Sequence, residues 1–311
     1  MPKKLFAGHP PITQLILTAF AMLTSMLLIG FIGMLLAPVL FGISMAEFMN
    51  IIAGGDVAGH LNVFRYMQTL YGISLFIVPA LFLGYLFSET LSDYFGFGKI
   101  LSVKYYFIVF LMILTVVPFI NLLASLNEMI VFPESLSWLE TKLRMSEDSA
   151  QKMTKQFLNV EHIGGMLFNI FMIALLPALG EELIFRGIFQ KIFVRWSGSI
   201  HVGIIISAFC FSAMHVQFYG FFPRWLLGCM FGYMLIWSGS IWLPVFAHFV
   251  NNAMAVIVSY MIFKEHLPEE VAEYGSSPAH IFVTIAATAV CGWLYWRMNK
   301  SLKVQQSKPV E

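Results

Sequence analysis

Apolar segments long enough to cross a bilayer recur along this chain of 311 residues. A membrane-spanning helix needs about 20 mostly apolar residues. The hydrocarbon core of a bilayer holds no water that could hydrogen-bond an exposed backbone N–H or C=O, so a spanning segment must pair these groups internally. The qualifying segments are roughly 13–41, 69–88, 104–126, 163–190, 200–219, 224–238, 241–263 and 279–297. The sixth is short, as a tilted or re-entrant element would be. The sequence therefore predicts an all-α, polytopic transmembrane helical bundle with about eight spans.

Composition supports a membrane protein and excludes several other classes. Apolar residues make up 59% and charged residues 11%, whereas soluble domains carry about 25% charged residues. The net charge of +1 gives no basic surface for nucleic acid. The three cysteines lie in apolar runs without metal-ligand spacing, which indicates buried thiols rather than a disulfide framework.

Lysine and arginine predict the orientation of the bundle, since they accumulate in cytoplasmic loops. With eight spans and both ends inside, the cytoplasmic side carries Lys3, Lys4, Lys99, Lys104, Lys191, Arg195, Arg297, Lys300, Lys303 and Lys308. The other side carries Arg65, Arg224 and Lys264, apart from one longer loop. Residues 309–311 form no retention signal, which favours a bacterial inner (cell) membrane.

The chain divides into N-terminal spans at 1–162, a membrane core at 163–300 and a polar tail at 301–311. The longer loop, about 127–162, has leucines at helical spacing among charged residues, so an amphipathic helix lying in the membrane interface is expected. It is either a plain connector or a lid or substrate guide for a functional site. No internal repeat supports a transporter built from repeated halves.

Ionisable side chains inside a span cost about 2.5–3.5 kcal/mol each on insertion scales, so they are candidate functional residues. In this chain they concentrate in the fourth, fifth and seventh segments. The sequence PALGEELIFRG lies in the fourth, FCFSAMH in the fifth and WLPVFAHFVNN in the seventh. The candidates are Glu181, Glu182, Arg186, His215, His248 and Asn252. One polar site in the second half of the chain is expected.

Helical spacing separates the roles of the two glutamates. Glu182 and Arg186 are four residues apart, share a helix face and can form an ion pair. Glu181 is rotated by about 100° and can face another neighbour as a general base. Glu182 and Arg186 would then support Glu181, although they could equally form a purely structural pair.

The other candidates supply complementary chemistry. His248 and Asn252 are four residues apart and could offer two donors to a developing oxyanion. His215 could orient a water beside Glu181. Alternatively, His215 is a hydrogen-bonded packing residue and Asn252 bridges two helices. The predicted boundaries place Glu181 and His248 in the cytoplasmic half and His215 in the opposite half, so a single site requires shifted ends or a tilted helix.

Taken together, the three segments resemble the motifs of the CAAX prenyl protease and bacteriocin-processing family of membrane peptidases. The motif E-E-x-x-x-R corresponds to Glu181, Glu182 and Arg186, F-x-x-x-H to Phe211 and His215, and H-x-x-x-N to His248 and Asn252. The motifs follow the family's order on separate predicted spans. Residues before 163 resemble the family only in spanning the membrane.

The resemblance implies an intramembrane endopeptidase whose partners are the lipid bilayer and a membrane-associated or lipidated polypeptide. In the eukaryotic branch the substrate is a prenylated C-terminal tetrapeptide motif, whereas bacterial branches are linked to bacteriocin processing or self-immunity. Two mechanisms are open. Glu181, His215 and His248 could bind zinc, or Glu181 and His215 could activate water while His248 and Asn252 form a metal-free oxyanion site.

The metal-free mechanism is favoured, and no cofactor is predicted, because asparagine is a poor zinc ligand and a good oxyanion donor. The sequence also lacks the H-E-x-x-H pattern that gives a ready metal face. Two other functions are possible. The chain could be a non-catalytic peptide-binding or scaffold protein, or a proton-coupled transporter that uses the same residues as a relay.

Overall fold

A computed structural model describes residues 4–54 and 59–306, and every regular element within those ranges is helical. Among the described residues, six helical rods are long and apolar enough to cross a membrane: Pro11–Phe41, Leu61–Phe87, Val103–Glu128, Ile163–Ser197, Trp242–Phe263 and Pro278–Lys303. Two shorter helices correspond to the fifth and sixth predicted segments. The chain is therefore a multi-pass, all-helical membrane protein, as the sequence predicts.

The N-terminal half contains three of the long rods. Its helices are α1 (Pro11–Phe41), α2 (Met45–Gly54), α3 (Leu61–Gly72), α4 (Val78–Phe87), α5 (Leu91–Phe95) and α6 (Val103–Glu128). A π-helical turn, η1 (Ile73–Ile77), joins α3 and α4 into one rod. This rod begins eight residues before the predicted span at 69–88, because its first turns are too polar to score as a span.

The C-terminal half carries all of the candidate site residues. Its helices are α7 (Ser137–Leu158), α8 (Ile163–Asn169), α9 (Leu176–Glu182), α10 (Gln190–Ser197), α11 (Ile200–Ala213), α12 (Phe221–Ser238), α13 (Trp242–Phe263) and α14 (Ile281–Gln306). Short 3₁₀ turns are η2 (Glu134–Leu136), η5 (Phe218–Gly220), η6 (Glu269–Val271) and η7 (Pro278–His280).

The rod from α8 to α10 is interrupted by two π-helical segments, η3 (Ile170–Leu175) and η4 (Leu183–Phe189). They flank α9, which carries both glutamates. Short π-helical segments inside α-helices are frequent at functional sites. The rod ends at Ser197 rather than near residue 190 as predicted, because the amphipathic α10 extends the apolar span.

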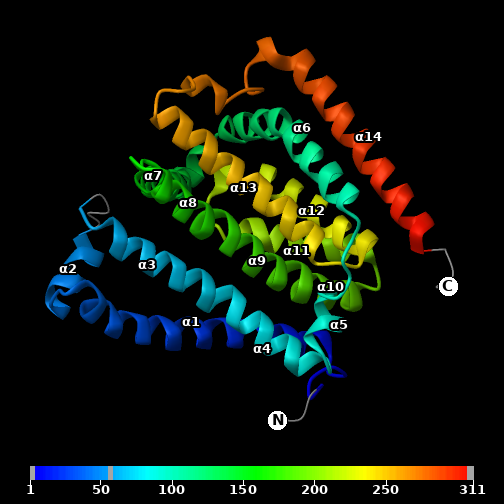
Figure 1. The fold of residues 1–311 in the computed structure, drawn as a ribbon, viewed down its shortest axis with the longest axis horizontal. Coiled ribbons are helices and arrows are strands. Elements are labelled where there is room, and N and C mark those ends of the chain that lie inside the picture. Colours follow the sequence, from blue (N-terminus) through cyan, green and yellow to red (C-terminus); the bar gives the residue numbers. More distant parts are fainter. Residues whose placement is uncertain (1–3, 55–58, 307–311) are drawn as a thin grey trace.

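The rods pack roughly lengthwise (Figure 1). α1 packs on the α3–α4 rod at one edge, α14 packs on α6 at the other, and α13 and the α8–α10 rod lie between them. The beginning of α1 and the end of α14 lie toward one end of the bundle, while α2 and α7 lie toward the opposite end. This placement agrees with an even number of crossings.

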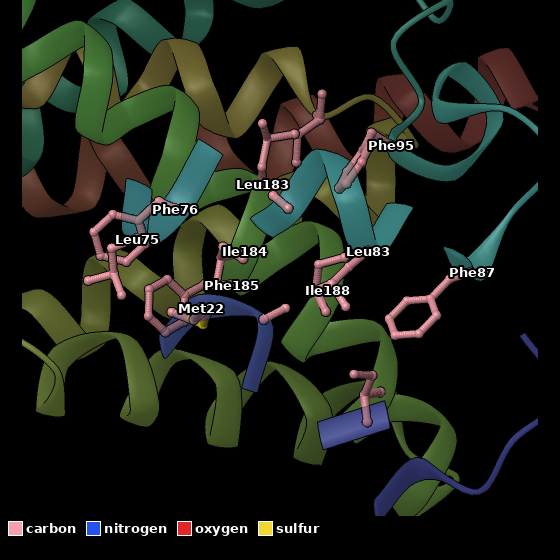
Figure 2. Packing of buried hydrophobic residues seen from close by; sticks show 14 of the residues in the cluster. Met22, Leu75, Phe76, Leu83, Phe87, Phe95, Leu183, Ile184, Phe185 and Ile188 are labelled. Carbon is pink, nitrogen blue, oxygen red and sulfur yellow. The ribbon is translucent and has the colours of Figure 1, made fainter. Parts of the chain in front are cut away.

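A core of aromatic and aliphatic side chains holds the α3–α4 rod against η4. Figure 2 shows Leu75 and Phe76 beside Ile184 and Phe185, and the rings of Phe76 and Phe185 have centroids 6.4 Å apart. Close approach at the neighbouring Gly187 depends on its lack of a side chain, since a Cβ there would lie 2.5 Å from the Phe95 ring. This packing fixes the helix that carries the glutamates.

The predicted helix in the longer loop is present as α7, at the end of the bundle away from the two termini. The predicted polar tail begins as helix, because α14 continues to Gln306. Lys3, Lys308 and residues 309–311, which entered the predictions of orientation and membrane, lie outside the described residues.

We expect a reporter fused after Ser301 to lie in the cytoplasm. The reason is the excess of lysine and arginine on that side of the predicted topology. Alkaline phosphatase and fluorescent-protein fusions at this position measure the location directly, and a fusion in the loop before α7 should give the opposite pattern. A periplasmic or external reporter after Ser301 would show that a crossing has been miscounted.

Candidate active site

The buried ion pair between Glu182 and Arg186 forms the base of the site. Nη1 of Arg186 lies 3.0 Å from Oε1 of Glu182, and the two side chains are 1% and 0% exposed. The guanidinium also lies over the rings of Phe211 and Phe231, at 4.5 and 5.6 Å from their centroids, and Nη2 donates to the carbonyl of Gly228 at 3.2 Å. The structure therefore brings together the predicted pair and anchors it to α11 and α12.

His248 links this pair to Glu181. Its Nδ1 donates to Oε1 of Glu182 at 2.9 Å, and its Nε2 lies 3.8 Å from Oε2 of Glu181. The imidazole stacks on the Phe231 ring, with centroids 5.6 Å apart and an interplanar angle of 25°. Because Nδ1 is committed as a donor, a neutral His248 presents a lone pair from Nε2, and only the imidazolium can donate from both nitrogens.

His215 lies just past the end of α11. Its Nδ1 donates to the carbonyl of Phe211 at 2.9 Å, which leaves Nε2 free to accept. The Ser207 hydroxyl donates to the carbonyl of Phe185 at 2.6 Å and fixes α11 against η4.

The predicted mismatch in depth arose from wrong helix boundaries. α11 ends at Ala213 rather than 219, and the rod before it ends at Ser197 rather than 190. Only a two-residue turn separates α10 from α11, and Glu181 and His215 each lie about four helical turns from it. They consequently reach the same level of the bundle.

Glu181, His215, His248 and Asn252 line one cavity of about 420 Å³. Glu182 and Arg186 lie behind it. The wall also includes residues that sequence reasoning did not assign to the site: Tyr71, Gln217, Arg224 and Asn251. Arg224 is an ionisable residue at the start of an apolar segment. Its position entered only the prediction of how the bundle is oriented in the membrane. The four residues predicted to be catalytic therefore come together from three separate helical regions.

Asn252 occupies this wall with a structural contact of its own. Its Nδ2 donates to the carbonyl of Ile173 at 3.2 Å, and its Oδ1 accepts from Nδ2 of Asn251 at 3.0 Å. Pro177 lies four residues after Ile173 and has no N–H, so that carbonyl lacks its α-helical donor. One N–H of the Asn252 amide is left for another acceptor.

A zinc site at this cavity would need three ligating side chains around one point. Within residues 4–54 and 59–306, no group of three histidine, cysteine, aspartate or glutamate side chains is placed to hold a metal ion. Glu181 and His248 face each other, but His215 does not complete a three-ligand group with them. The residues as arranged do not form a three-ligand zinc site, and zinc binding through Glu181, His215 and His248 stays the untested alternative to the predicted metal-free site.

Comparison with known proteins identifies the same part of the chain. A family model described as type II CAAX prenyl endopeptidase Rce1-like matches residues 163–254. The sporulation-killing factor biosynthesis protein SkfC of Bacillus subtilis (strain 168) is 35% identical over 94 residues, which cover 28% of this chain and 18% of SkfC. The uncharacterized protein YpbD of the same organism is 30% identical over 93 residues, covering 28% of this chain and 43% of YpbD.

These matches cover less than half of either relative's length. No solved structure matches the chain. The matched segment contains Glu181, His215, His248 and Asn252, together with the ion pair behind them. Residues 163–254, which carry the whole site, are therefore similar to the type II CAAX prenyl endopeptidases.

Proposed function

We propose that this protein is an intramembrane endopeptidase that hydrolyses a membrane-associated or lipidated polypeptide with a glutamate-activated water. The observation that carries the proposal is the placement of Glu181. Its carboxylate lies on a cavity shared with His215 and faces Nε2 of His248, inside a bundle of membrane-spanning helices. A carboxylate and two imidazoles around one space are a set suited to moving a proton from water.

In the proposed reaction, Glu181 takes one proton from a water that His215 holds through its free Nε2. The water oxygen forms a bond to the scissile carbonyl carbon, and the carbonyl oxygen becomes an oxyanion. When the C–N bond breaks, the proton on Glu181 passes to the departing amine. Water is thereby consumed and a new carboxyl and amino terminus are produced, with no other reactant.

The oxyanion role assigned to His248 requires a proton on Nε2. Since Nδ1 already donates to Glu182, His248 is an imidazolium in this step. The carboxylate of Glu182 stabilises that charge at short range, while Arg186 on the same carboxylate keeps its position fixed. Asn252 contributes its remaining amide N–H. These two donors would act on charge that develops in the transition state.

Cleavage by the purified protein tests the proposal. The protein is reconstituted in vesicles with a set of membrane-anchored peptides, half of them carrying an isoprenyl thioether, and new termini are identified by mass spectrometry. We expect cleavage by the wild type and none by Glu181→Gln. Binding without cleavage by either protein would favour a scaffold, and proton uptake coupled to solute movement would favour a transporter.

Metal dependence is measured with the same reaction. We expect cleavage to continue after exhaustive chelation and the purified protein to contain far less than one zinc per chain. The physical reason is that the proposed proton transfers use side chains alone. Loss of activity on chelation, with recovery when zinc is added back, would instead identify Glu181, His215 and His248 as ligands.

A further inference from the structure

The turn that follows His215 is held in a strained conformation. Val216 has φ of 53°, in the left-handed region. A β-branched residue rarely adopts this region, and such strain persists only where the surroundings impose it. The Val216 side chain is 63% exposed, so its own packing does little to hold the turn. Contacts from other helices must therefore stabilise the conformation of this turn.

Helix α7 supplies two of these contacts. The Ser146 hydroxyl donates to the carbonyl of Val216 at 3.1 Å. The Gln217 amide donates to Oε1 of Glu147 at 3.4 Å. Glu147 is 9% exposed, and its Oε2 is buried without a hydrogen-bond partner. A carboxylate is costly to bury in this way unless its position is fixed by a charge network.

Arg224 closes that network from α12. It donates through Nη1 to Oε1 of Gln217 at 3.4 Å and through Nη2 to the Gln217 carbonyl. Gln217 thus lies between Glu147 and Arg224, directly after the strained residue. Both residues that follow His215 are bound at their backbone carbonyls, one by α7 and the other by α12.

Helix α7 also borders the cavity. Ala150, one turn beyond Ser146, and Thr154, a further turn on, line the wall together with His215 and Gln217. One face of α7 therefore contacts both the turn and the space where the substrate would lie. A shift of α7 would move the turn and change the direction of the His215 ring.

We propose that Ser146 and Glu147 are positioning residues that hold the strained turn at Val216 and thereby direct His215 into the cavity. In this way an amphipathic helix outside the bundle's spanning rods controls the geometry of the reaction. The kinetic consequence rests on the proposed peptidase function, because it requires His215 to act in catalysis. The effect of Ser146 and Glu147 on the conformation of the turn does not depend on that function.

The kinetic test compares Ser146→Ala with Ser149→Ala. Ser149 is on the same helix, but its hydroxyl donates to the carbonyl of Met145 within α7, so it is the matched control. We expect Ser146→Ala to lower kcat by about 3- to 10-fold, the effect of losing one hydrogen bond, with KM unchanged. Ser149→Ala should match the wild type.

Relief of the strain provides a second comparison. Glycine adopts positive φ readily, so in a V216G background the turn depends less on Ser146. In the V216G background we expect Ser146→Ala to lower kcat by less than roughly twofold. The reason is that glycine removes the backbone strain at position 216 against which the Ser146 hydrogen bond acts. An equal loss of kcat in both backgrounds, or equal kcat for Ser146→Ala and Ser149→Ala, would overturn the proposal.

Hydrogen–deuterium exchange tests the turn without any need for activity. We expect the amides of residues 214–217 to exchange faster in Ser146→Ala than in the wild type and Ser149→Ala, with the rest of α11 unchanged. Unchanged exchange in the turn would refute the positioning role even if no substrate is cleaved. Glu147→Ala should act in the same direction, and it replaces Ser146→Ala in both measurements if that variant does not fold.

Discussion

Glu181→Gln is expected to reduce turnover to background while the protein stays folded and continues to bind peptide. Glutamine keeps the size of the side chain but cannot accept the proton of water. Loss of general-base catalysis typically costs about 100- to 10,000-fold in rate. The measurement is single-turnover cleavage in vesicles, with peptide binding and thermal unfolding recorded on the same preparation. Cleavage at the normal rate would remove Glu181 from its assigned role.

Asn252→Ala tests whether Asn252 acts in the chemical step or has a substrate-binding or structural role. Losing one oxyanion donor costs about 100- to 1,000-fold in turnover, with little change in binding, because the donor acts in the transition state. The structure adds a small loss of stability, since the variant leaves the carbonyl of Ile173 without the Asn252 donor. A parallel loss of binding and turnover would instead make Asn252 a substrate-binding or purely structural residue.

Much of the bundle could be predicted because each span is almost uniformly apolar. Uniform hydrophobicity, however, contains little information about where a helix ends or bends. The π-helical segments on either side of α9 have no sequence signal comparable to an apolar run. The short α2 and α5 were not predicted, because neither is long enough to register as a span.

The site was predictable to the extent that charge inside a span is rare. Glu181, His215 and His248 were identified on this basis, and they do line one cavity. Their individual partners were not predictable, because those contacts join residues far apart in the chain. His248 bonds to Glu182, 66 positions away, and Asn252 bonds to the carbonyl of Ile173, 79 positions away. Spacing along one helix could not reveal that each has a separate partner.

Arg186→Ala is expected to destabilise the protein strongly as well as abolish cleavage. Glu182 is fully buried, and its Oε2 already lacks a hydrogen-bond partner. Removing the guanidinium leaves the carboxylate with His248 as its one remaining partner among the described residues, and breaking a buried pair in this way costs about 3–5 kcal/mol. The loss should appear as a large fall in the midpoint of thermal unfolding in detergent.

The matched control is Arg144→Ala, which breaks a pair of the same spacing on α7. Nη2 of Arg144 lies 2.8 Å from Oε1 of Glu140, whose side chain is 17% exposed, whereas that of Glu182 is 0% exposed. Water reaches part of the remaining Glu140 carboxylate, which also accepts from the Phe132 N–H, so the midpoint should fall less than in Arg186→Ala. The double variant Glu182→Gln/Arg186→Ala should recover part of the stability, because it removes the buried negative charge. Equal effects of the two arginine substitutions would show that burial of the Glu182 carboxylate does not govern the stability of this site.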